Sequence, residues 1–244
     1  MSRPVYDRIG HGYADVRKPN PRLAAVIADV LGDARTILNV GAGTGAYEPD
    51  DRFVVAVEPS MVMIRQRARG PAVRAVAEAL PFDDGAFDAA MATSTVHHWT
   101  DRVAGLREMR RAAARVVIAT WLPGAGEPFW LDTDYFPEEA DRMSASYPTA
   151  AELEDALGPI DVHVVPVPWD CEDGGDAYWR RPERYLDERV WRSLSGFALL
   201  DPAERERGLA KLEADLVSGA WRERHAHLLE REELDLGYRL VVTR

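Results

Sequence analysis

The stretch TILNVGAGTGAYEPDDRFVVAVEPS (residues 36–60) is the part of the chain that decides the fold. Gly41, Gly43 and Gly45 directly follow one apolar run, and Glu58 ends the next apolar run. Glycine permits a positive φ and lets a ligand approach the backbone closely. Open α/β sheets bind ligands at the carboxyl ends of their strands, where an acidic residue can accept both hydroxyls of a ribose. The stretch therefore predicts a nucleotide site shared by two neighbouring strands.

The bulk composition limits the classes of protein that the chain can belong to. With 244 residues, 46% of them hydrophobic, it can bury a core as one large domain or as a domain with an insert. A formal net charge of −11 disfavours nucleic acid and anionic membranes as partners. Cys171 is the only cysteine, which excludes an internal disulfide and a cysteine-based metal cluster. No apolar run reaches the roughly 20 residues of a membrane span, so we expect a cytoplasmic protein. The single cysteine and the spacing of the histidines give no reason to expect a metal site.

Short β-rich runs recur along the chain, with helical patterns between several of them. We expect strands at residues 36–40, 53–57, 72–76, 87–93, 115–120, 162–170 and 236–244. Helical patterns occupy residues 19–32, 60–69, 101–114 and 149–158. Alternating strands and helices indicate a parallel sheet with helices on both faces, and near-continuous apolar strands are typical of burial on both sides. The prolines in residues 162–170 indicate an irregular or edge strand.

Residues 171–233 interrupt this alternation with a mostly helical pattern. We therefore predict a nucleotide-binding domain formed by residues 1–170 and 234–244, with residues 171–233 as a helical insert. Since the insert falls between the last two strands, we expect it to form a lid.

Two kinds of nucleotide fit the glycine loop. GAGTGA also matches the dinucleotide pattern, which needs a helix N-terminus to hold a pyrophosphate. The crossover from Gly41 to Phe53 is close to the minimum length, so only a stub of helix fits there. Glu48, Asp50 and Asp51 also make it acidic, unless they are simply solvated turn residues. A short, acidic crossover favours a cationic ligand without phosphate, such as S-adenosylmethionine, over a nicotinamide dinucleotide.

Four sequence blocks occur in a recognisable order: VGAGTG (40–45), AVEPSMVMIRQR (56–67), AEALPFDDGAFDAAMA (77–92) and TVHHW (95–99). Together they resemble the class I S-adenosylmethionine-dependent methyltransferases, and most closely the small-molecule branch with the ubiquinone/menaquinone-type enzymes. The resemblance covers residues 1–122. It implies a Rossmann-like, doubly wound, mostly parallel α/β sheet of seven strands with an antiparallel last strand, and a cofactor that leaves as S-adenosylhomocysteine.

The resemblance also implies roles for individual residues of the cofactor site. Glu58 would bind the ribose hydroxyls, and Arg17, in the leader block YADVRKP (13–19), would pair with the carboxylate of the methionine part. The other implied cofactor contacts are Tyr13, Gly41, Ala42, Gly43, Gly45, Pro59, Ser60, Met61, Ala77, Glu78, Ala79 and Thr93. Relatives usually carry an acid where Asn39 stands and often an aspartate where Val76 stands, so these two contacts are replaced here.

Methyl transfer is an in-line displacement, and holding the acceptor beside the methyl carbon lowers much of the barrier. A base is needed only where the acceptor loses a proton. His97 and His98 follow the fourth strand on the cofactor side, and an imidazole titrates near neutrality. Tyr13 is a second candidate for orienting the acceptor. Either histidine has the alternative role of fixing the loop by hydrogen bonds.

Aromatic residues beyond position 120 have two possible roles. They either wall an apolar acceptor pocket or pack in the core of the insert: Trp121, Trp130, Tyr135, Phe136, Tyr178, Trp179 and Trp191.

The sequence therefore predicts an enzyme that methylates a small molecule on oxygen, nitrogen or an electron-rich carbon, without nucleic-acid or membrane partners. A protein that binds the cofactor without methylating is one alternative, and an NAD-dependent oxidoreductase is another.

Overall fold

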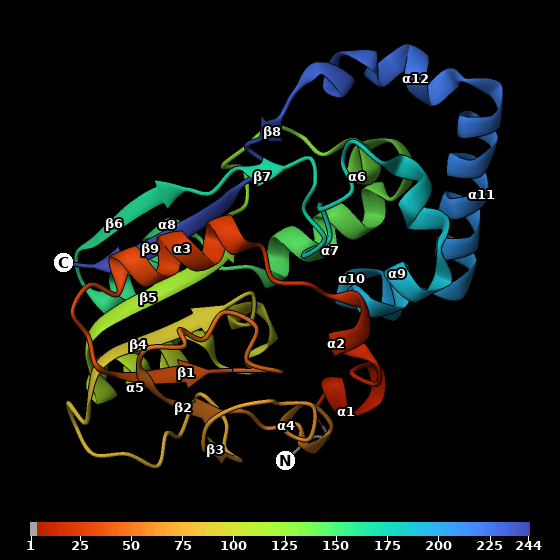
Figure 1. The fold of residues 1–244 in the computed structure, drawn as a ribbon. Helices are drawn as coiled ribbons and strands as arrows, with labels where there is room; N and C mark the ends of the chain where they lie inside the picture. The colour runs from red at the N-terminus through yellow and green to blue at the C-terminus, as the bar shows by residue number, and fades with distance from the viewer. Residues whose placement is uncertain (1–3) are drawn as a thin grey trace.

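The structure is a computed structural model, and it describes residues 4–244 except for the side chains of residues 15 and 16 (Figure 1). The strands are β1 (Thr36–Val40), β2 (Phe53–Val57), β3 (Ala72–Val73), β4 (Phe87–Thr93), β5 (Ala113–Trp121), β6 (Ile160–Val164), β7 (Val167–Pro168), β8 (Glu233–Leu234) and β9 (Tyr238–Thr243). The α-helices are α1 (Tyr6–Ile9), α2 (Tyr13–Val16), α3 (Pro21–Val30), α4 (Met61–Ile64), α5 (Arg102–Ala112), α6 (Trp130–Tyr135), α7 (Pro137–Ser146), α8 (Ala150–Leu157), α9 (Glu188–Ser193), α10 (Ser195–Leu199), α11 (Pro202–Ser218) and α12 (Ala220–His225). Short 3₁₀ helices are η1 (Val96–His98), η2 (Pro182–Leu186) and η3 (Ala226–Glu230).

One large sheet organises the described chain. Its strand order is β3–β2–β1–β4–β5–β9–β6, with β1 to β5 parallel and β9 antiparallel to both β5 and β6. The predicted Rossmann-like sheet of seven strands with an antiparallel last strand is therefore confirmed. The order reverses between β1 and β4, which is the point where open α/β sheets place their ligands.

Helices cover both faces of the sheet, as Figure 1 shows, with α3 on one side and α5 and α8 on the other. Alternate residues of a strand point to opposite faces. In β1, Leu38 packs in the core beneath α5 and α8, whereas Ile37 packs beneath α3. This two-sided burial explains why the strands are apolar almost without interruption.

Local chemistry sets the ends of these helices. Asn20 caps α3 and accepts a hydrogen bond from the backbone N–H of Arg22 at 3.0 Å, with Pro21 at the first helical position. Thr149 caps α8 in the same way, and Gly158, with φ of 83°, ends it.

The structure corrects three of the predicted elements. The third strand ends at Val73 rather than at residue 76, and the helix expected over residues 60–69 is limited to α4. The strand expected over residues 162–170 is divided into β6 and β7, with Pro166 between them. A proline has no N–H to donate to a ladder, and β6 is at the edge of the sheet, as the prolines of residues 162–170 had indicated.

A second hydrophobic core lies beyond the carboxyl ends of the parallel strands, where α6, α7 and α9–α12 gather (Figure 1). It contains Trp179 and Tyr185 with no exposed side-chain surface, together with Phe129 and Trp130 from before residue 171. The strands β7 and β8 pair at its base.

No described helix is long and apolar enough to cross a membrane.

The crossover between β1 and β2, residues 41–52, contains no helix, not even the stub that the sequence allows. One of its three acids is not a solvated turn residue. The side chain of Glu48 is 4% exposed and accepts hydrogen bonds from Arg67 Nη2 at 2.8 Å and from Asn39 Nδ2 at 2.8 Å. Asp50 and Asp51 are exposed, as the solvated-turn interpretation requires. The buried Glu48–Arg67 pair fixes the crossover against the segment that follows α4.

Removing Arg67 is expected to destabilise the protein. Arg67→Ala leaves the carboxylate of Glu48 buried without a charge partner, so the free energy of unfolding should fall by about 3–5 kcal/mol. The control is Arg69→Ala, which breaks an exposed pair with Asp50 and should cost less than about 1 kcal/mol. Urea unfolding measures both values. Equal losses in the two variants would contradict the structural role of the buried pair.

Candidate functional site

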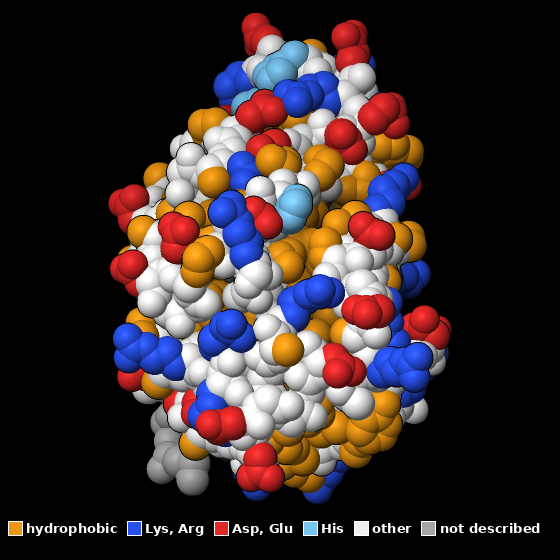
Figure 2. Space-filling view, turned by 90° about the vertical axis from the view of Figure 1, so that its left-hand side faces the viewer, with side chains coloured by type: hydrophobic (Ala, Val, Ile, Leu, Met, Phe, Trp, Pro, Cys, Tyr) orange, Lys and Arg blue, Asp and Glu red, His pale blue; other side chains and the backbone are white. Residues whose placement is uncertain are grey.

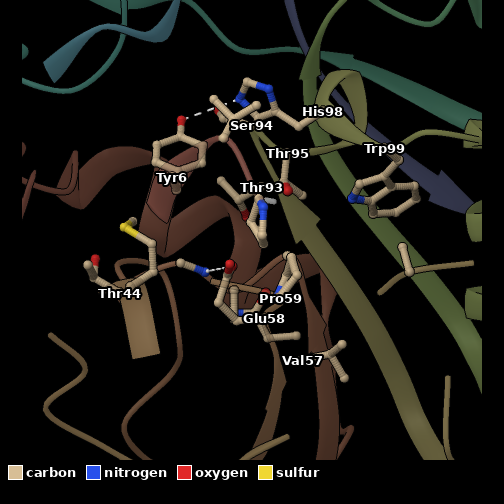
Figure 3. A pocket seen from close by; sticks show the side chains of 18 of the residues that line it. Tyr6, Thr44, Val57, Glu58, Pro59, Thr93, Ser94, Thr95, His98 and Trp99 are labelled. Carbon is tan, nitrogen blue, oxygen red and sulfur yellow. Dashed lines mark hydrogen bonds between the residues drawn. The ribbon is translucent and has the colours of Figure 1, made fainter. Parts of the chain in front are cut away.

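A cavity of about 640 Å³ opens at the carboxyl ends of β1, β2 and β4 (Figure 3). Its wall is formed by the leader helices α1 and α2, the glycine loop, the end of β2 and the segments that follow β3 and β4. Asp173 of the insert completes it. Its size lies within the range of about 300–1,000 Å³ that is common for small-molecule sites.

Glu58, the last residue before the turn after β2, is 6% exposed and points toward the glycine loop. Its two oxygens accept hydrogen bonds from the backbone N–H of Gly43 at 2.9 Å and of Ser60 at 2.8 Å. Burial raises the pKa of this carboxyl, and the two backbone N–H groups oppose that rise. Each oxygen keeps a second lone pair, so the carboxylate can accept further hydrogen bonds from a ligand.

The glycine loop lies close against the segment after β4. Gly41 has a φ of 69°, and a Cβ at this position would lie 2.1 Å from Thr95 Oγ1. Ser94 has a φ of 50°, an uncommon conformation for a non-glycine residue. It turns the chain out of β4 and places Thr93, Ser94 and Thr95 together on the cavity wall (Figure 3).

The leader and the insert meet on one side of the cavity. Arg17 Nε donates to Asp173 Oδ1 at 2.5 Å, and the hydroxyl of Tyr47 donates to Asp173 Oδ2 at 2.5 Å. The guanidinium of Arg17 also lies over the ring of Tyr13, 5.2 Å from its centroid. Both Nη groups of Arg17 lack a partner among the described residues. Arg17 therefore lines the cavity with its two Nη groups free to donate hydrogen bonds to a ligand.

Tyr6 and His98 face each other on the cavity wall, and the ring of Tyr6 also packs edge to face on Tyr13, with centroids 5.8 Å apart. Tyr6 Oη lies 3.3 Å from His98 Nε2, and the two rings pack edge to face with centroids 5.3 Å apart (Figure 3). Burial lowers the pKa of His98 to about 4 and raises the pKa of Tyr6 above its usual range. At neutral pH the imidazole is therefore uncharged and the phenol protonated, so the phenol can donate to Nε2.

His97 lies behind His98, outside the cavity wall. Its ring stacks on Tyr147 with centroids 4.1 Å apart, and its Nε2 is 3.3 Å from Tyr147 Oη. Burial, followed by the nearby His98 and Arg102, holds the pKa of His97 well below its ordinary value. Of the two histidines predicted as bases, only His98 reaches the cavity.

The structure brings most of the predicted cofactor residues to one wall. The residues that line the cavity are Tyr13, Arg17, Gly41, Ala42, Gly43, Glu58, Pro59, Ala77, Glu78 and Thr93. The predicted residues outside the wall are Gly45, Ser60, Met61 and Ala79.

Two of these outlying residues, Gly45 and Ser60, contact structural groups. A Cβ at Gly45 would lie 2.9 Å from both Glu48 Oε2 and Arg67 Nη1. Ser60 caps α4 and donates its hydroxyl to Asp7 at 2.7 Å. In place of Met61, the cavity is lined by Met63, two residues further along α4 and so on another side of that helix.

Several residues of the cavity wall were not predicted from the sequence. Tyr6, Tyr47, Met63, Trp99 and Asp173 line the cavity. Tyr6 precedes the recognisable leader block, and Asp173 belongs to the insert, so neither carried a positional signal. Tyr47 was noticed only as part of an acidic crossover.

The aromatic residues beyond position 120 pack in the core of the insert rather than around the cavity. Six of the predicted ones belong to or pack against that second core: Trp130, Tyr135, Phe136, Tyr178, Trp179 and Trp191. Trp121 packs edge to face on Tyr147, with ring centroids 5.2 Å apart. None of the seven is among the residues that line the cavity.

Comparisons with known proteins identify the family of the chain. Residues 38–115 match a family model described as a methyltransferase domain. A crystal structure of a putative methyltransferase from an antibiotic biosynthesis pathway of Anabaena variabilis is 30% identical and superposes with a TM-score of 0.87. The match covers 94% of this chain and 99% of that chain, helical part included.

Two further similarities are more distant. A phosphoethanolamine N-methyltransferase of Haemonchus contortus, solved with phosphomonomethylethanolamine and S-adenosylhomocysteine, is 14% identical, with a TM-score of 0.52 over 92% of this chain and 52% of that chain. A tRNA (carboxymethyluridine(34)-5-O)-methyltransferase, alkbh8 of Xenopus tropicalis, is 25% identical over 177 residues, which are 65% of this chain. The match spans only 27% of that relative.

Proposed function

The chain belongs to the class I S-adenosylmethionine-dependent methyltransferases, and we propose that it methylates a small molecule bound in the remaining part of the same cavity. The observation that carries the proposal is that one cavity joins the Gly43–Glu58 contact to the Tyr6–His98 pair. The Gly43–Glu58 contact can hold a nucleoside, and the Tyr6–His98 pair can accept a proton. The narrower assignment to the ubiquinone/menaquinone-type branch stays a prediction.

The residues of the wall fit S-adenosylmethionine. Glu58 keeps lone pairs for the two ribose hydroxyls, and the Nη groups of Arg17 can take a carboxylate. Ala77 and Glu78 line the part of the wall expected at the adenine edge. A nicotinamide dinucleotide is a poorer fit, because residues 41–52 provide no helix N-terminus for its pyrophosphate.

The charges around the cavity favour a small acceptor over a nucleic acid. Among the described residues of the wall, Glu58, Glu78, Asp101 and Asp173 are acidic, while the cation Arg17 is already paired with Asp173. Figure 2 shows the face at the left of Figure 1, which lies at the amino ends of the parallel strands and away from the cavity; acidic and basic side chains alternate there with hydrophobic ones and form no basic stripe. A polyanion such as tRNA requires a basic surface. The activity named for the distant tRNA-modifying relative therefore receives no support from the cavity.

The cofactor supplies an electrophilic methyl group on a sulfonium sulfur. The residues of the wall would hold the acceptor atom beside that methyl group, in the alignment that methyl transfer requires. The hydroxyl of Tyr6 takes the proton that the acceptor atom loses as it passes its own proton to His98 Nε2, so His98 is the final base. Closure by the leader and the insert keeps water away from the reacting atoms.

The ribose contact gives a direct test of the cofactor site. Glu58→Ala should weaken binding of S-adenosylhomocysteine by about 10- to 150-fold, since a hydrogen bond to a charged group is worth about 1.5–3 kcal/mol. Calorimetry measures the dissociation constant. The control is Glu108→Gln, because Glu108 also accepts a backbone N–H, from Leu80 at 2.9 Å, but lies outside the cavity. Unchanged affinity in Glu58→Ala would contradict the assignment.

A second test concerns the proposed base. His98→Ala should lower kcat by about 100-fold or more while changing the affinity for S-adenosylhomocysteine little, because His98 faces the acceptor side. His163→Ala, an exposed histidine on β6, is the matched control. Because burial holds the pKa of His98 near 4, the base stays neutral above that pH and is lost as pH falls through it. Full activity in His98→Ala would exclude this role.

The class of acceptor can be tested without knowing its identity. The protein is incubated with S-adenosylmethionine labelled in its methyl group, in one arm with a low-molecular-mass cell extract and in the other with total tRNA. We expect label in the low-mass fraction, and we expect His98→Ala to lose it. Label that enters only tRNA would overturn the proposal for a small acceptor, whereas the cofactor assignment would stand.

A further inference from the structure

The outer side of the edge strand β6 has no partner strand in the described part of the chain. β6 pairs with β9 on its inner side and is the last strand of the sheet (Figure 1). The strand at the opposite edge, β3, has only two residues. An unpaired edge can pair with another chain, and natural proteins prevent this with short edge strands, prolines or lysines. β6 has neither a proline nor a lysine between Pro159 and Pro166, so all five of its residues can accept a partner strand.

Hydrogen bonds at the two ends of β6 show which of its backbone groups face outward. The N–H of Val165 donates to the carbonyl oxygen of Tyr238 at 3.0 Å, and the N–H of Arg244 donates to the carbonyl oxygen of Pro159 at 3.0 Å. In an antiparallel pair, residues that bond to the neighbouring strand alternate with residues that do not. The backbone groups that point away from β9, toward the free edge, are therefore those of Ile160, Val162 and Val164.

The side chains of β6 form an apolar row on one face and a polar row on the other. Ile160 packs in the core with α5 and α8, and Val162 and Val164 continue its row because alternate residues share a face. These two valines are 44% and 55% exposed. Asp161 and His163 lie on the opposite face and are exposed as well. An acid and an imidazole thus flank the central valine of the strand.

Two copies of β6 complement each other in antiparallel order with Val162 at the centre. Val162 then exchanges both backbone hydrogen bonds with Val162 of the second copy, and Ile160 does the same with Val164. The apolar rows join on one face. On the other face Asp161 lies opposite His163 of the second copy, at a non-hydrogen-bonded position, where side chains approach most closely. A pairing centred on Asp161 would instead put two acids opposite each other and leave part of the strand unpaired.

The carboxylate of Asp161 is able to make this contact. Arg244 Nε and Nη2 both bind Asp161 Oδ1, each at 2.8 Å. The other oxygen, Oδ2, has no partner among the described residues. The imidazole of His163 can donate a hydrogen bond to that oxygen whether or not the ring is protonated. The intramolecular ion pair is therefore kept when the second copy binds.

We propose that β6 pairs with β6 of a second copy of this chain, in antiparallel order about Val162, so that the two sheets form one continuous sheet across a dimer. Such a contact uses the same patch on both copies, as a two-fold axis requires. In the sheet order, β9 and β5 separate β6 from β4, so each copy keeps its own cavity. The dimer is independent of the proposed function, because no residue of β6 lines the cavity.

Sedimentation velocity tests the dimer at protein concentrations from about 1 μM to about 1 mM, where we expect a monomer–dimer equilibrium. Val162→Lys places two ammonium groups opposite each other and should weaken the dimer by about 10-fold or more. Val217→Lys is the matched control and should keep the dimer, because Val217 is an exposed valine of α11, far from β6 (Figure 1). Absence of a dimer over this range, or a dimer that Val162→Lys leaves unchanged, would overturn the proposal.

An exchange of charges tests the register of the two strands. His163→Glu alone puts an acid opposite Asp161 of the second copy, so it should weaken the dimer. Asp161→Lys combined with His163→Glu puts opposite charges there again and should restore it. Both side chains are exposed, and an unchanged midpoint of urea unfolding shows that the variants fold. A double variant that dimerises no better than His163→Glu would contradict this register.

Amide hydrogen exchange gives a readout that needs no substitution. The exchange rates are measured by NMR at a low and at a high protein concentration. The outward amides of Ile160, Val162 and Val164 should become protected as the dimer forms, whereas those of Asp161 and His163, which already bond to β9, should change little. A dimer that forms without this alternating protection has another interface, and the proposal would then be wrong.

Discussion

The geometry of the cavity depends on the contact between Glu58 and the backbone N–H of Gly43. It joins the end of β2 to the loop after β1, beside the position between β1 and β4 where the strand order reverses. The same carboxylate accepts the backbone N–H of Ser60, which begins α4 and in turn contacts Asp7 of the leader. One buried charge thus fixes three segments that are distant in sequence. It leaves lone pairs directed at the place where a ribose is expected.

A second contact closes the cavity from outside the sheet. Asp173 of the insert binds both Arg17 of the leader and Tyr47 of the glycine loop. We place the nucleoside at the carboxyl ends of the parallel strands and the acceptor beside the leader and the insert. The hydrophobic cores on the two faces of the sheet and the core of the helical part therefore meet at a polar seam, where we place the chemistry.

The fold was predictable because its main signals are local. The apolar strands, the glycine loop, and caps such as Asn20 and Thr149 are all visible in short windows of sequence. The burial of Glu48 was not predictable, because its partner Arg67 lies 19 positions away and nothing local distinguishes it from the exposed Asp50.

The same limit applies to the residues of the site, which could be predicted only where they belong to a short block of sequence. Glu58, Gly43 and His98 were found because they belong to sequence blocks with fixed spacing. Tyr6 and Asp173 were missed because only the folded chain brings them to the cavity. The two histidines are adjacent in sequence, yet only the structure separates His98, which faces the cavity, from His97, which stacks behind it on Tyr147.

The most direct test of the central claim is a crystal structure of the protein with S-adenosylhomocysteine. The account predicts both ribose hydroxyls within hydrogen-bonding distance of the Glu58 carboxylate, with the sulfur directed toward Tyr6 and His98. Adenosine bound elsewhere, or a ribose that makes no contact with Glu58, would contradict it.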